Sequence, residues 1–290
     1  MAWIQFICHT TPDKADALSD AFSDCGAAAV SFEDDADQPL YEPELGTTPL
    51  WNQTRLTALF SADDDINAIQ TQLKPWLDEL LSYRIEAVED KDWEREWMDN
   101  FHPIQFGQRL WICPSWHTPP APEAINILLD PGLAFGTGTH ATTALCLNWL
   151  DQADLQGKYV IDYGCGSGIL AIAAALLGAE KVIGVDTDPQ ALQATQENAR
   201  RNGVVIDVYL PDDCPSAPCD VLLANILAGP LQSLAPRFAK LSKPNAELVL
   251  SGILPSQVDA VAAAYQDNFT LQPASHKDDW SRLNGTRHVD

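Results

Sequence analysis

The chain has 290 residues, enough for one large domain or two of ordinary size, and 46% of them are hydrophobic, which is ample for a core. Its net charge of −24 argues against direct binding of DNA or RNA, because phosphate contacts need basic surface. We expect no membrane span, since no apolar run reaches about 18 residues. The N-terminus lacks the features of a secretory signal.

The seven cysteines form no C-x-x-C motif, and several lie within apolar runs. This pattern predicts reduced thiols in a cytoplasmic protein rather than a disulfide framework. Cys214 and Cys219 could meet in one loop, but no histidine pair completes a zinc site, so we expect no metal.

The acidic charge is concentrated in the first third of the chain. Residues 1–100 contain 22 Asp and Glu against 6 Lys and Arg, whereas residues 101–290 contain 19 against 11. Such a surface could attract a basic protein partner. It could equally serve solubility or adaptation to salt, and composition leaves both readings open.

Residues 1–90 are expected to form a first domain. Its strands are predicted at Trp3–Cys8, Ala28–Phe32, Arg55–Phe60 and Tyr83–Val88, and its helices at Pro12–Cys25 and Asp63–Leu81. The order β-α-β-β-α-β is typical of a ferredoxin-like α+β domain. No group of residues here indicates chemistry, so we expect binding or docking, with a purely structural appendage as the alternative.

Residues 91–125 are expected to connect two domains. A short helix is predicted at Lys91–Asp99, irregular chain at Phe101–Phe106 and a strand at Leu110–Cys113, before a proline-rich stretch. The tryptophans of this connector are expected to pack between domains rather than to line a ligand cage.

A β-α-β unit dominates the remaining sequence. An apolar strand around Val160 leads into a glycine-rich turn at Gly164–Gly168, an apolar helix at Ile169–Leu177 and a second strand at Lys181–Val185. Glycines in such a turn let a ligand approach the backbone closely, and the helix N-terminus offers free N–H groups. The unit therefore predicts a ligand site.

Asp186 follows the second strand, 22 residues after Gly164, where a carboxylate can accept hydrogen bonds from two ribose hydroxyls. A dinucleotide fingerprint would need a third glycine at position 169, which is Ile169, so hydride transfer is disfavoured. The actual spacing, G-x-G-x-G after Asp162, resembles motif I of methyltransferases that use S-adenosylmethionine.

A second glycine-rich loop, DPGLAFGTGTHATT at residues 130–143, lies between a predicted strand at Ile125–Leu129 and a predicted helix at Ala144–Leu150. Helix capping explains one of its threonines, but not three glycines around Phe135. We expect this loop, including Phe135, to fold over a ligand.

Asn225 ends the predicted strand Asp220–Ala224 and precedes Ile226. Amine methyltransferases often have N-P-P-Y or D-P-P-Y at this position. There the Asn side-chain oxygen and the following backbone carbonyl can accept hydrogen bonds from a target amine, which points the nitrogen lone pair at the methyl carbon. A turn-forming Asn is the alternative.

The rest of the chain is expected to complete a mostly parallel sheet. Further strands are predicted at Asp207–Leu210, Glu247–Leu250, Phe269–Leu271 and Trp280–Leu283, with a helix at Pro255–Tyr265.

Four motifs, DPGLAFGTGTHATT, IDYGCGSGILAIAA, GVDTDP and ANILAGPL, together resemble the ribosomal protein L-eleven (L11) methyltransferase family, PrmA. Departures are small: Ala141 stands where proline is common, and Tyr163 where phenylalanine is common. The resemblance implies an α/β architecture: a Rossmann-like class I methyltransferase domain at 126–290, a ferredoxin-like substrate-recognition domain at 1–90 and a connector at 91–125.

The resemblance also implies roles for single residues. Thr143 matches a loop threonine that contacts S-adenosylmethionine, Gly164 and Gly166 match the turn beside its methionine part, Asp186 matches the ribose acid, and Asn225 matches a residue that contacts both cofactor and amine. The implied activity is transfer of methyl groups from S-adenosylmethionine to lysine amines and the N-terminal α-amine of ribosomal protein L11, up to trimethylation, without a metal.

Catalysis would consist mainly of aligning amine, methyl carbon and sulfur. The amine must be neutral; His140 is a candidate general base that could equally cap a helix, and loss of the proton to water is the simpler expectation. Two alternatives stay open, a methyltransferase of another protein amine and a non-catalytic escort of ribosomal protein that binds S-adenosylmethionine. A turnover assay separates them.

Overall fold

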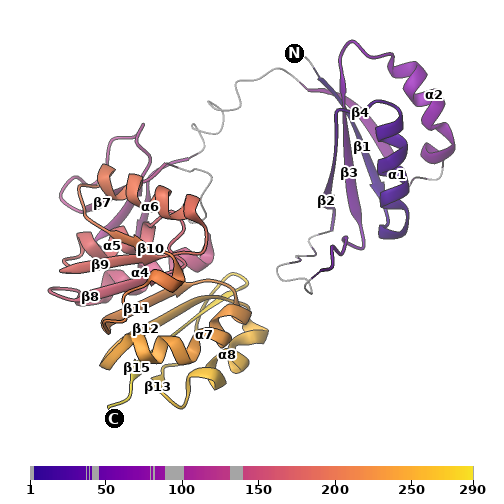
Figure 1. Ribbon diagram of the computed structural model, residues 1–290. Helices are drawn as coiled ribbons and strands as arrows, with labels where there is room; N and C mark the ends of the chain where they lie inside the picture. The colour runs from indigo at the N-terminus through magenta and orange to yellow at the C-terminus, as the bar shows by residue number, and fades with distance from the viewer. Residues whose placement is uncertain are drawn as a thin grey trace. The chain divides into compact units, whose positions relative to one another are not determined.

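The computed structural model describes residues 3–36, 38, 40, 46–78, 80, 82–88, 101–130 and 140–289. The chain divides into two compact units, Met1–Met98 and Asp99–Asp290 (Figure 1). The predictions for the Lys91–Asp99 helix, for Phe135 and for most of the loop at residues 130–143 lie outside the described residues.

The first unit has the predicted element order. Its elements are β1 (Trp3–Thr10), α1 (Pro12–Asp24), β2 (Ala29–Asp34), β3 (Thr54–Ser61), α2 (Ile66–Leu77) and β4 (Ser82–Val88). The strands pair antiparallel in the order β2-β3-β1-β4, which is the ferredoxin-like arrangement. Helix α2 begins later than predicted because Asp65 caps it, accepting hydrogen bonds from the backbone N–H groups of Asn67 and Ala68.

One face of this sheet packs against the two helices. Phe6 of β1, Phe22 of α1 and Phe60 of β3 are fully buried, with ring centroids 5.4 to 6.2 Å apart in edge or tilted contacts. Aromatic pairs in this geometry contribute beyond the area that they bury. Leu73 from α2 completes the same core, so the unit has a hydrophobic centre of its own.

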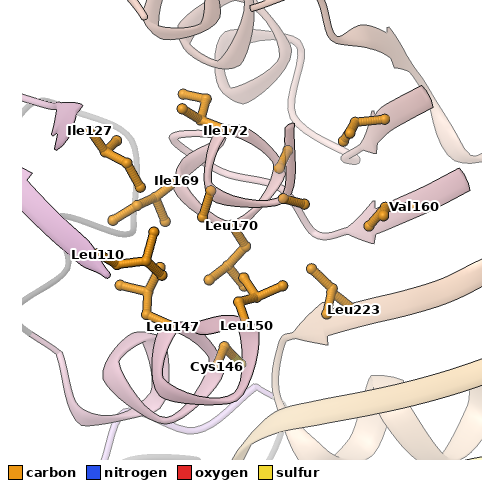
Figure 2. Close-up of a cluster of buried hydrophobic side chains, with 14 of the residues drawn as sticks. Leu110, Ile127, Cys146, Leu147, Leu150, Val160, Ile169, Leu170, Ile172 and Leu223 are labelled. Atoms are coloured by element: carbon orange, nitrogen blue, oxygen red, sulfur yellow. The ribbon is translucent and has the colours of Figure 1, made fainter. Parts of the chain in front are cut away.

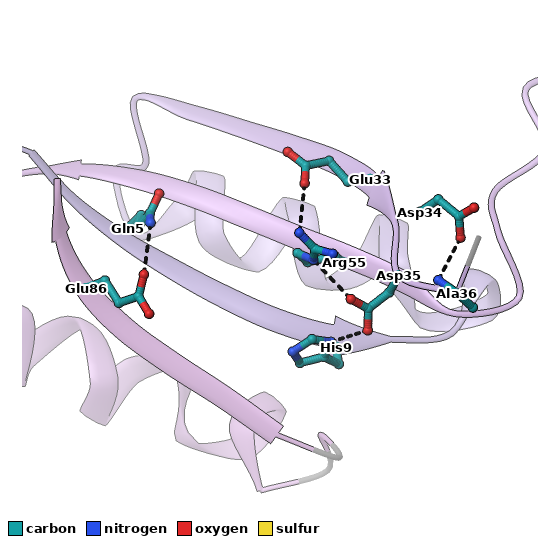
Figure 3. Close-up of polar contacts among 8 residues, drawn as sticks. All are labelled: Gln5, His9, Glu33, Asp34, Asp35, Ala36, Arg55 and Glu86. Carbon is teal, nitrogen blue, oxygen red and sulfur yellow. Dashed lines mark hydrogen bonds and ion pairs between the residues drawn. The ribbon is translucent and has the colours of Figure 1, made fainter. Parts of the chain in front are cut away.

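The opposite face of the sheet carries a polar network (Figure 3). Arg55 donates from Nε to Asp35 at 3.0 Å and from Nη1 to Glu33 at 3.3 Å, and Nδ1 of His9 contacts the other oxygen of Asp35. Desolvation raises the pKa of Asp35, but its hydrogen bonds with His9 and Arg55 outweigh this and hold the pKa below its ordinary value.

The second unit is built on a mostly parallel sheet. Its strands are β8 (Tyr159–Tyr163), β9 (Lys181–Val185), β10 (Asp207–Tyr209), β11 (Cys219–Asn225), β12 (Ser242–Ile253), β13 (Phe269–Leu271), β14 (Ser275–Lys277) and β15 (Trp280–Arg287). The order is β10-β9-β8-β11-β12-β15-β13, with β14 beside β15. The first five strands are parallel and β15 is antiparallel to its neighbours, as a Rossmann-like methyltransferase domain requires.

Helices cover both faces of this sheet (Figure 1). They are α4 (Ala141–Gln152), α5 (Ile169–Leu176), α6 (Pro189–Arg201), α7 (Ala228–Leu241) and α8 (Val258–Tyr265), with short 3₁₀ turns at Pro211–Asp213 and Pro255–Gln257. Side chains alternate between the faces, so Val160 of β8 packs in the cluster with α4 and α5, whereas Ile161 packs in the cluster with α7 and α8.

Much of the predicted connector belongs to the core of the second unit. Strands β5 (Ile104–Phe106), β6 (Leu110–Cys113) and β7 (Ile125–Leu128) form a three-stranded sheet. Leu110 and Ile127 from this sheet contact the cluster that includes Leu147 of α4 and Ile169 of α5 (Figure 2). The prediction of irregular chain at Phe101–Phe106 is wrong for its last three residues, which pair antiparallel with β6.

A buried carboxylate fastens the β5–β6 hairpin to the end of α4. Asp151 accepts hydrogen bonds from the backbone N–H groups of Gln108 and Arg109, both at 2.8 Å. Gly107 makes room for it, because a Cβ there would lie 2.1 Å from Asp151 Oδ2. The hairpin and the C-terminal end of α4 are thus held as one piece.

Candidate functional site

A cavity of about 490 Å³ opens at the carboxyl ends of four parallel strands. Gly164 follows β8, Asp186 follows β9, Asn225 ends β11, and Gly252 lies one residue before the end of β12; all four line the cavity. Ligands of open α/β sheets bind at this edge. The predicted residues Gly164, Gly166, Asp186 and Asn225 are therefore brought to one place.

The glycine-rich turn adopts a backbone that favours glycine. Gly164, Gly166 and Gly168 have φ of 83°, 53° and 81°. Gly164 also lies under Ile226, since a Cβ at position 164 would come 2.2 Å from the Cγ2 of that residue. The N–H of Gly164 donates to the carbonyl of Val185 at 2.6 Å, which ties the turn to the end of β9.

The carboxylate of Asp186 is held by backbone donors on both oxygens. Oδ2 accepts from Gly166 N at 2.9 Å, and Oδ1 accepts from Asp188 N at 3.0 Å. Each carboxylate oxygen can accept more than one hydrogen bond. The group is therefore fixed at the cavity wall and can still accept from a ligand diol.

Asn225 and Thr143 hydrogen-bond to each other across 82 positions of sequence. Asn225 Nδ2 donates to Thr143 Oγ1 at 3.3 Å. Thr143 lies in the first turn of α4 and is fully buried behind Asn225, whereas its neighbour Thr142 lines the cavity. Because the amide nitrogen faces Thr143, the side-chain oxygen of Asn225 points away from it.

His140 is the N-cap of α4. Its Nδ1 accepts from Thr142 N at 3.4 Å and lies 2.8 Å from Thr142 Oγ1. The helix therefore begins at Ala141, three residues before the prediction. Burial lowers the pKa of His140, so the imidazole is mainly neutral at pH 7. Trp280 packs against the ring with a centroid distance of 5.2 Å.

Asp162, which sequence reasoning named only as the residue before the motif I glycines and gave no site role, is a buried acid beneath the site. It is 1% exposed; Oδ2 accepts from Ala171 N at 3.0 Å, and among the described residues Oδ1 has no hydrogen-bond partner. Burial raises the pKa of Asp162 to about 7. The sequence signal that could have identified it as a buried group is an acidic residue inside an otherwise apolar strand.

Apolar side chains form much of the remaining cavity wall, beside Thr187. Ile226, Leu227, Pro230 and Leu234 line it from the start of α7, and Leu227 is 46% exposed. Within the described ranges, no group of three or more His, Cys, Asp or Glu could hold a metal ion. The same part of the chain contains no helix that is long and apolar enough to cross a membrane.

Known proteins match this chain over nearly its whole length. The family model for "Ribosomal protein L11 methyltransferase (PrmA)" matches residues 2–288. Ribosomal protein L11 methyltransferases of Shewanella piezotolerans and Pseudomonas aeruginosa are 58% and 54% identical, over 99% and 100% of this chain and 100% of each relative. The crystal structure of a ribosomal protein L11 methylase from Lactobacillus delbrueckii subsp. bulgaricus is 33% identical, with a TM-score of 0.58 over 65% of this chain and 100% of that one.

Proposed function

The chain belongs to the ribosomal protein L11 methyltransferase family (PrmA), and we propose that it methylates ribosomal protein L11 itself, with S-adenosylmethionine as donor. The targets are lysine ε-amines and the N-terminal α-amine, and the products reach trimethylation. Such a substrate implies a cytoplasmic enzyme, and the reaction needs no metal.

The residues at the cavity suit this donor. Gly164 and Gly166 line the cavity with backbone in the positive-φ region that favours glycine, and Asp186 can accept from both ribose hydroxyls while its two backbone donors hold it. Phe135 is a further proposed contact. Thr143, expected from the sequence to contact the donor, is fully buried and is instead proposed to act through its hydrogen bond to Asn225. When bound, S-adenosylmethionine supplies an electrophilic methyl group on a sulfonium sulfur.

The observation that carries the proposal is the anchored amide of Asn225. Its hydrogen bond to Thr143 fixes which way the amide faces, so its oxygen can accept from a target amine. Ile226, the next residue, also lines the cavity, and its backbone carbonyl is the proposed second acceptor. Two acceptors orient the N–H groups and thereby direct the nitrogen lone pair.

Transfer joins the amine nitrogen to the methyl carbon with the nitrogen lone pair, while the electrons of the carbon–sulfur bond stay on sulfur. The first two transfers leave a proton to be lost to water; the third gives a quaternary ammonium without proton loss. His140 is supported as a cap rather than a base, because its Nδ1 already accepts from Thr142. The protein contributes alignment.

We also propose that residues 1–90 recognise the protein substrate for the catalytic unit, which begins at Asp99 rather than at the predicted residue 126 and includes most of the predicted connector at 91–125. The acidic balance of residues 1–100, 22 against 6, favours a basic protein partner over nucleic acid or an anionic membrane surface. Removing residues 1–90 should raise KM for intact L11 and leave S-adenosylmethionine binding unchanged. If the shortened protein kept its turnover with an unchanged KM for L11, residues 1–90 would have no role in substrate recognition.

The decisive experiment is intact mass of purified ribosomal protein L11 after incubation with this protein and S-adenosylmethionine. We expect gains in steps of one methyl that reach whole trimethyl sets. Asn225→Ala should slow the gain about 100-fold, because the amine loses its alignment. Asn245→Gly, at an exposed Asn with φ of 63°, is the matched control and should behave as wild type.

Absence of any gain would reject L11 as the substrate. If calorimetry then still detected S-adenosylmethionine binding, another protein amine or the escort role would replace the proposal. If neither methyl transfer nor binding were found, the cofactor assignment would fall as well.

A further inference from the structure

Ile226 is held between two glycines that are distant in sequence. Its side chain lies over Gly164, where a Cβ would come 2.2 Å from Cγ2. Its backbone lies against Gly252, where a Cβ would come 2.3 Å from the carbonyl oxygen and 2.9 Å from the carbonyl carbon. Both contacts are shorter than any side chain tolerates, so Ile226 keeps this place only while both positions are glycine.

Strand pairing explains why Gly252 reaches Ile226. Strands β11 and β12 are parallel, and Asn225 pairs with Ser251, so the next residues of the two strands are neighbours. Gly252 has φ of 86°, and the register of β12 against β15 shifts between Ser251 and Ile253. This irregularity turns the Gly252 backbone toward the Ile226 carbonyl, at the cavity that both residues line.

The same end of β12 also secures the start of α4. The hydroxyl of Ser251, which is fully buried, donates to the carbonyl of Thr142 at 3.0 Å. Thr143, the next residue, anchors the amide of Asn225. Ser251 therefore holds the helix start that anchors the Asn225 amide, the first proposed acceptor. Gly252 contacts the Ile226 carbonyl, the second proposed acceptor, directly.

We propose that Gly252 is a positioning residue for amine methylation, which sets the Ile226 carbonyl as the second acceptor of the target N–H groups. This inference rests on the proposed function. A side chain at position 252 would meet backbone rather than a movable side chain, so the carbonyl itself would have to shift.

The proposal predicts an effect that depends on the methylation state of the substrate. A neutral primary amine has two N–H groups and a secondary amine has one, whereas a tertiary amine has none to donate. Loss of an acceptor should therefore slow the first two transfers and spare the third. A purely structural defect would slow all three alike.

The test compares Gly252→Ala with Gly203→Ala on ribosomal protein L11 and on L11 whose target lysine is already dimethylated. Gly203 is the matched control, because it has φ of 67° but nothing within 4 Å of an added Cβ. For Gly252→Ala we expect kcat of the first transfer to fall about 10-fold or more, with less than about 2-fold loss on dimethylated L11. Calorimetry should give wild-type affinity for S-adenosylmethionine.

Gly203→Ala should lose thermal stability from the same strained φ and keep wild-type kcat on both substrates. Equal slowing of all transfers by Gly252→Ala, or no slowing, overturns the inference. Inactive wild-type protein would instead mean that the proposed function has failed.

A second variant covers the case in which Gly252→Ala does not fold. Replacing Leu227 by its α-hydroxy acid analogue turns the 226–227 amide into an ester, which makes the Ile226 carbonyl a weaker acceptor and leaves every side chain in place. The ester variant should again lose kcat on unmodified L11 and keep it on dimethylated L11. If both substrates were affected alike, the role of this carbonyl would be rejected.

Discussion

The amide nitrogen of Asn225 and the hydroxyl of Thr143 lie 3.3 Å apart, at the end of β11 and in the first turn of α4. The contact links two residues predicted separately as parts of one site. It also gives them different tasks, since Asn225 lines the cavity and Thr143 is buried behind it.

Thr143→Val should therefore act mainly on turnover. Valine keeps the shape but removes the hydroxyl, so the Asn225 amide loses its anchor and can rotate. We expect kcat to fall about 10-fold, with a smaller change in affinity for S-adenosylmethionine. Steady-state kinetics and calorimetry separate the two; a large loss of affinity with unchanged kcat would instead favour direct contact between Thr143 and the donor.

Asp186→Asn should weaken binding of S-adenosylmethionine. The amide has one acceptor oxygen in place of two, so one of the donors Gly166 N and Asp188 N would face an NH₂ group. We expect the Kd measured by calorimetry to rise about 10- to 100-fold, as for loss of hydrogen bonds to a charged group.

Asp188→Ala is the control for this change. Asp188 caps α6 by accepting from Gln190 N at 2.9 Å, so its loss should lower stability by about 1 kcal/mol without a comparable effect on Kd. Equal Kd for the Asp186 variant and wild type would contradict the ribose assignment.

Asp162 should make stability depend on pH. Its pKa is raised from 3.8 to about 7 in the folded state, so between these values the folded protein binds more protons here than the unfolded chain does. Stability from this group is thus present at low pH and falls as pH rises toward 7. Asp162→Asn should be more stable than wild type at pH 8 by about 1 to 3 kcal/mol, with the difference shrinking toward pH 4.

Urea unfolding of both proteins without cofactor, at several pH values, measures this difference. All other titrating groups are common to the two proteins and largely cancel. Parallel curves of stability against pH would show that Asp162 has the same pKa in the folded and unfolded states.

The cysteines should differ sharply in reactivity. Burial raises the pKa of Cys8, Cys146, Cys165 and Cys219 to about 12, and each of them is nearly inaccessible. Cys25 and Cys214 are partly exposed. Titration of the native protein with a thiol reagent at pH 8 should label these two first and all seven only after unfolding; rapid labelling of more than two would contradict the burial.

Local pattern was sufficient for the β-α-β unit. The turn Gly164–Gly168, the strand Lys181–Val185 and the acid at 186 lie where spacing predicted them, because glycine conformation and strand length are set by nearby residues. Helix α6 was missed although Asp188 followed by Pro189 is a helix-start signal. Strand β5 is too short for its alternation to be read from sequence.

The importance of Gly252 could not have been predicted in the same way. Nothing around it in sequence requires a glycine for a ligand, and the requirement arises only when β12 pairs with β11 and brings it to Ile226. The burial of Thr143 is likewise a tertiary effect. The sequence shows which residue types follow each strand. Which of these residues contact one another across the sheet is known only from the folded structure.

Helix α4 joins two features that are far apart along the chain. At its C-terminal end Asp151 grips the hairpin that begins the second unit, and at its N-terminal end His140 and Thr142 form part of the cavity wall. A helix of 12 residues spans about 18 Å. A displacement of the hairpin would therefore move one end of an element whose other end lines the cavity, so the two places are linked through α4 although they lie about 18 Å apart.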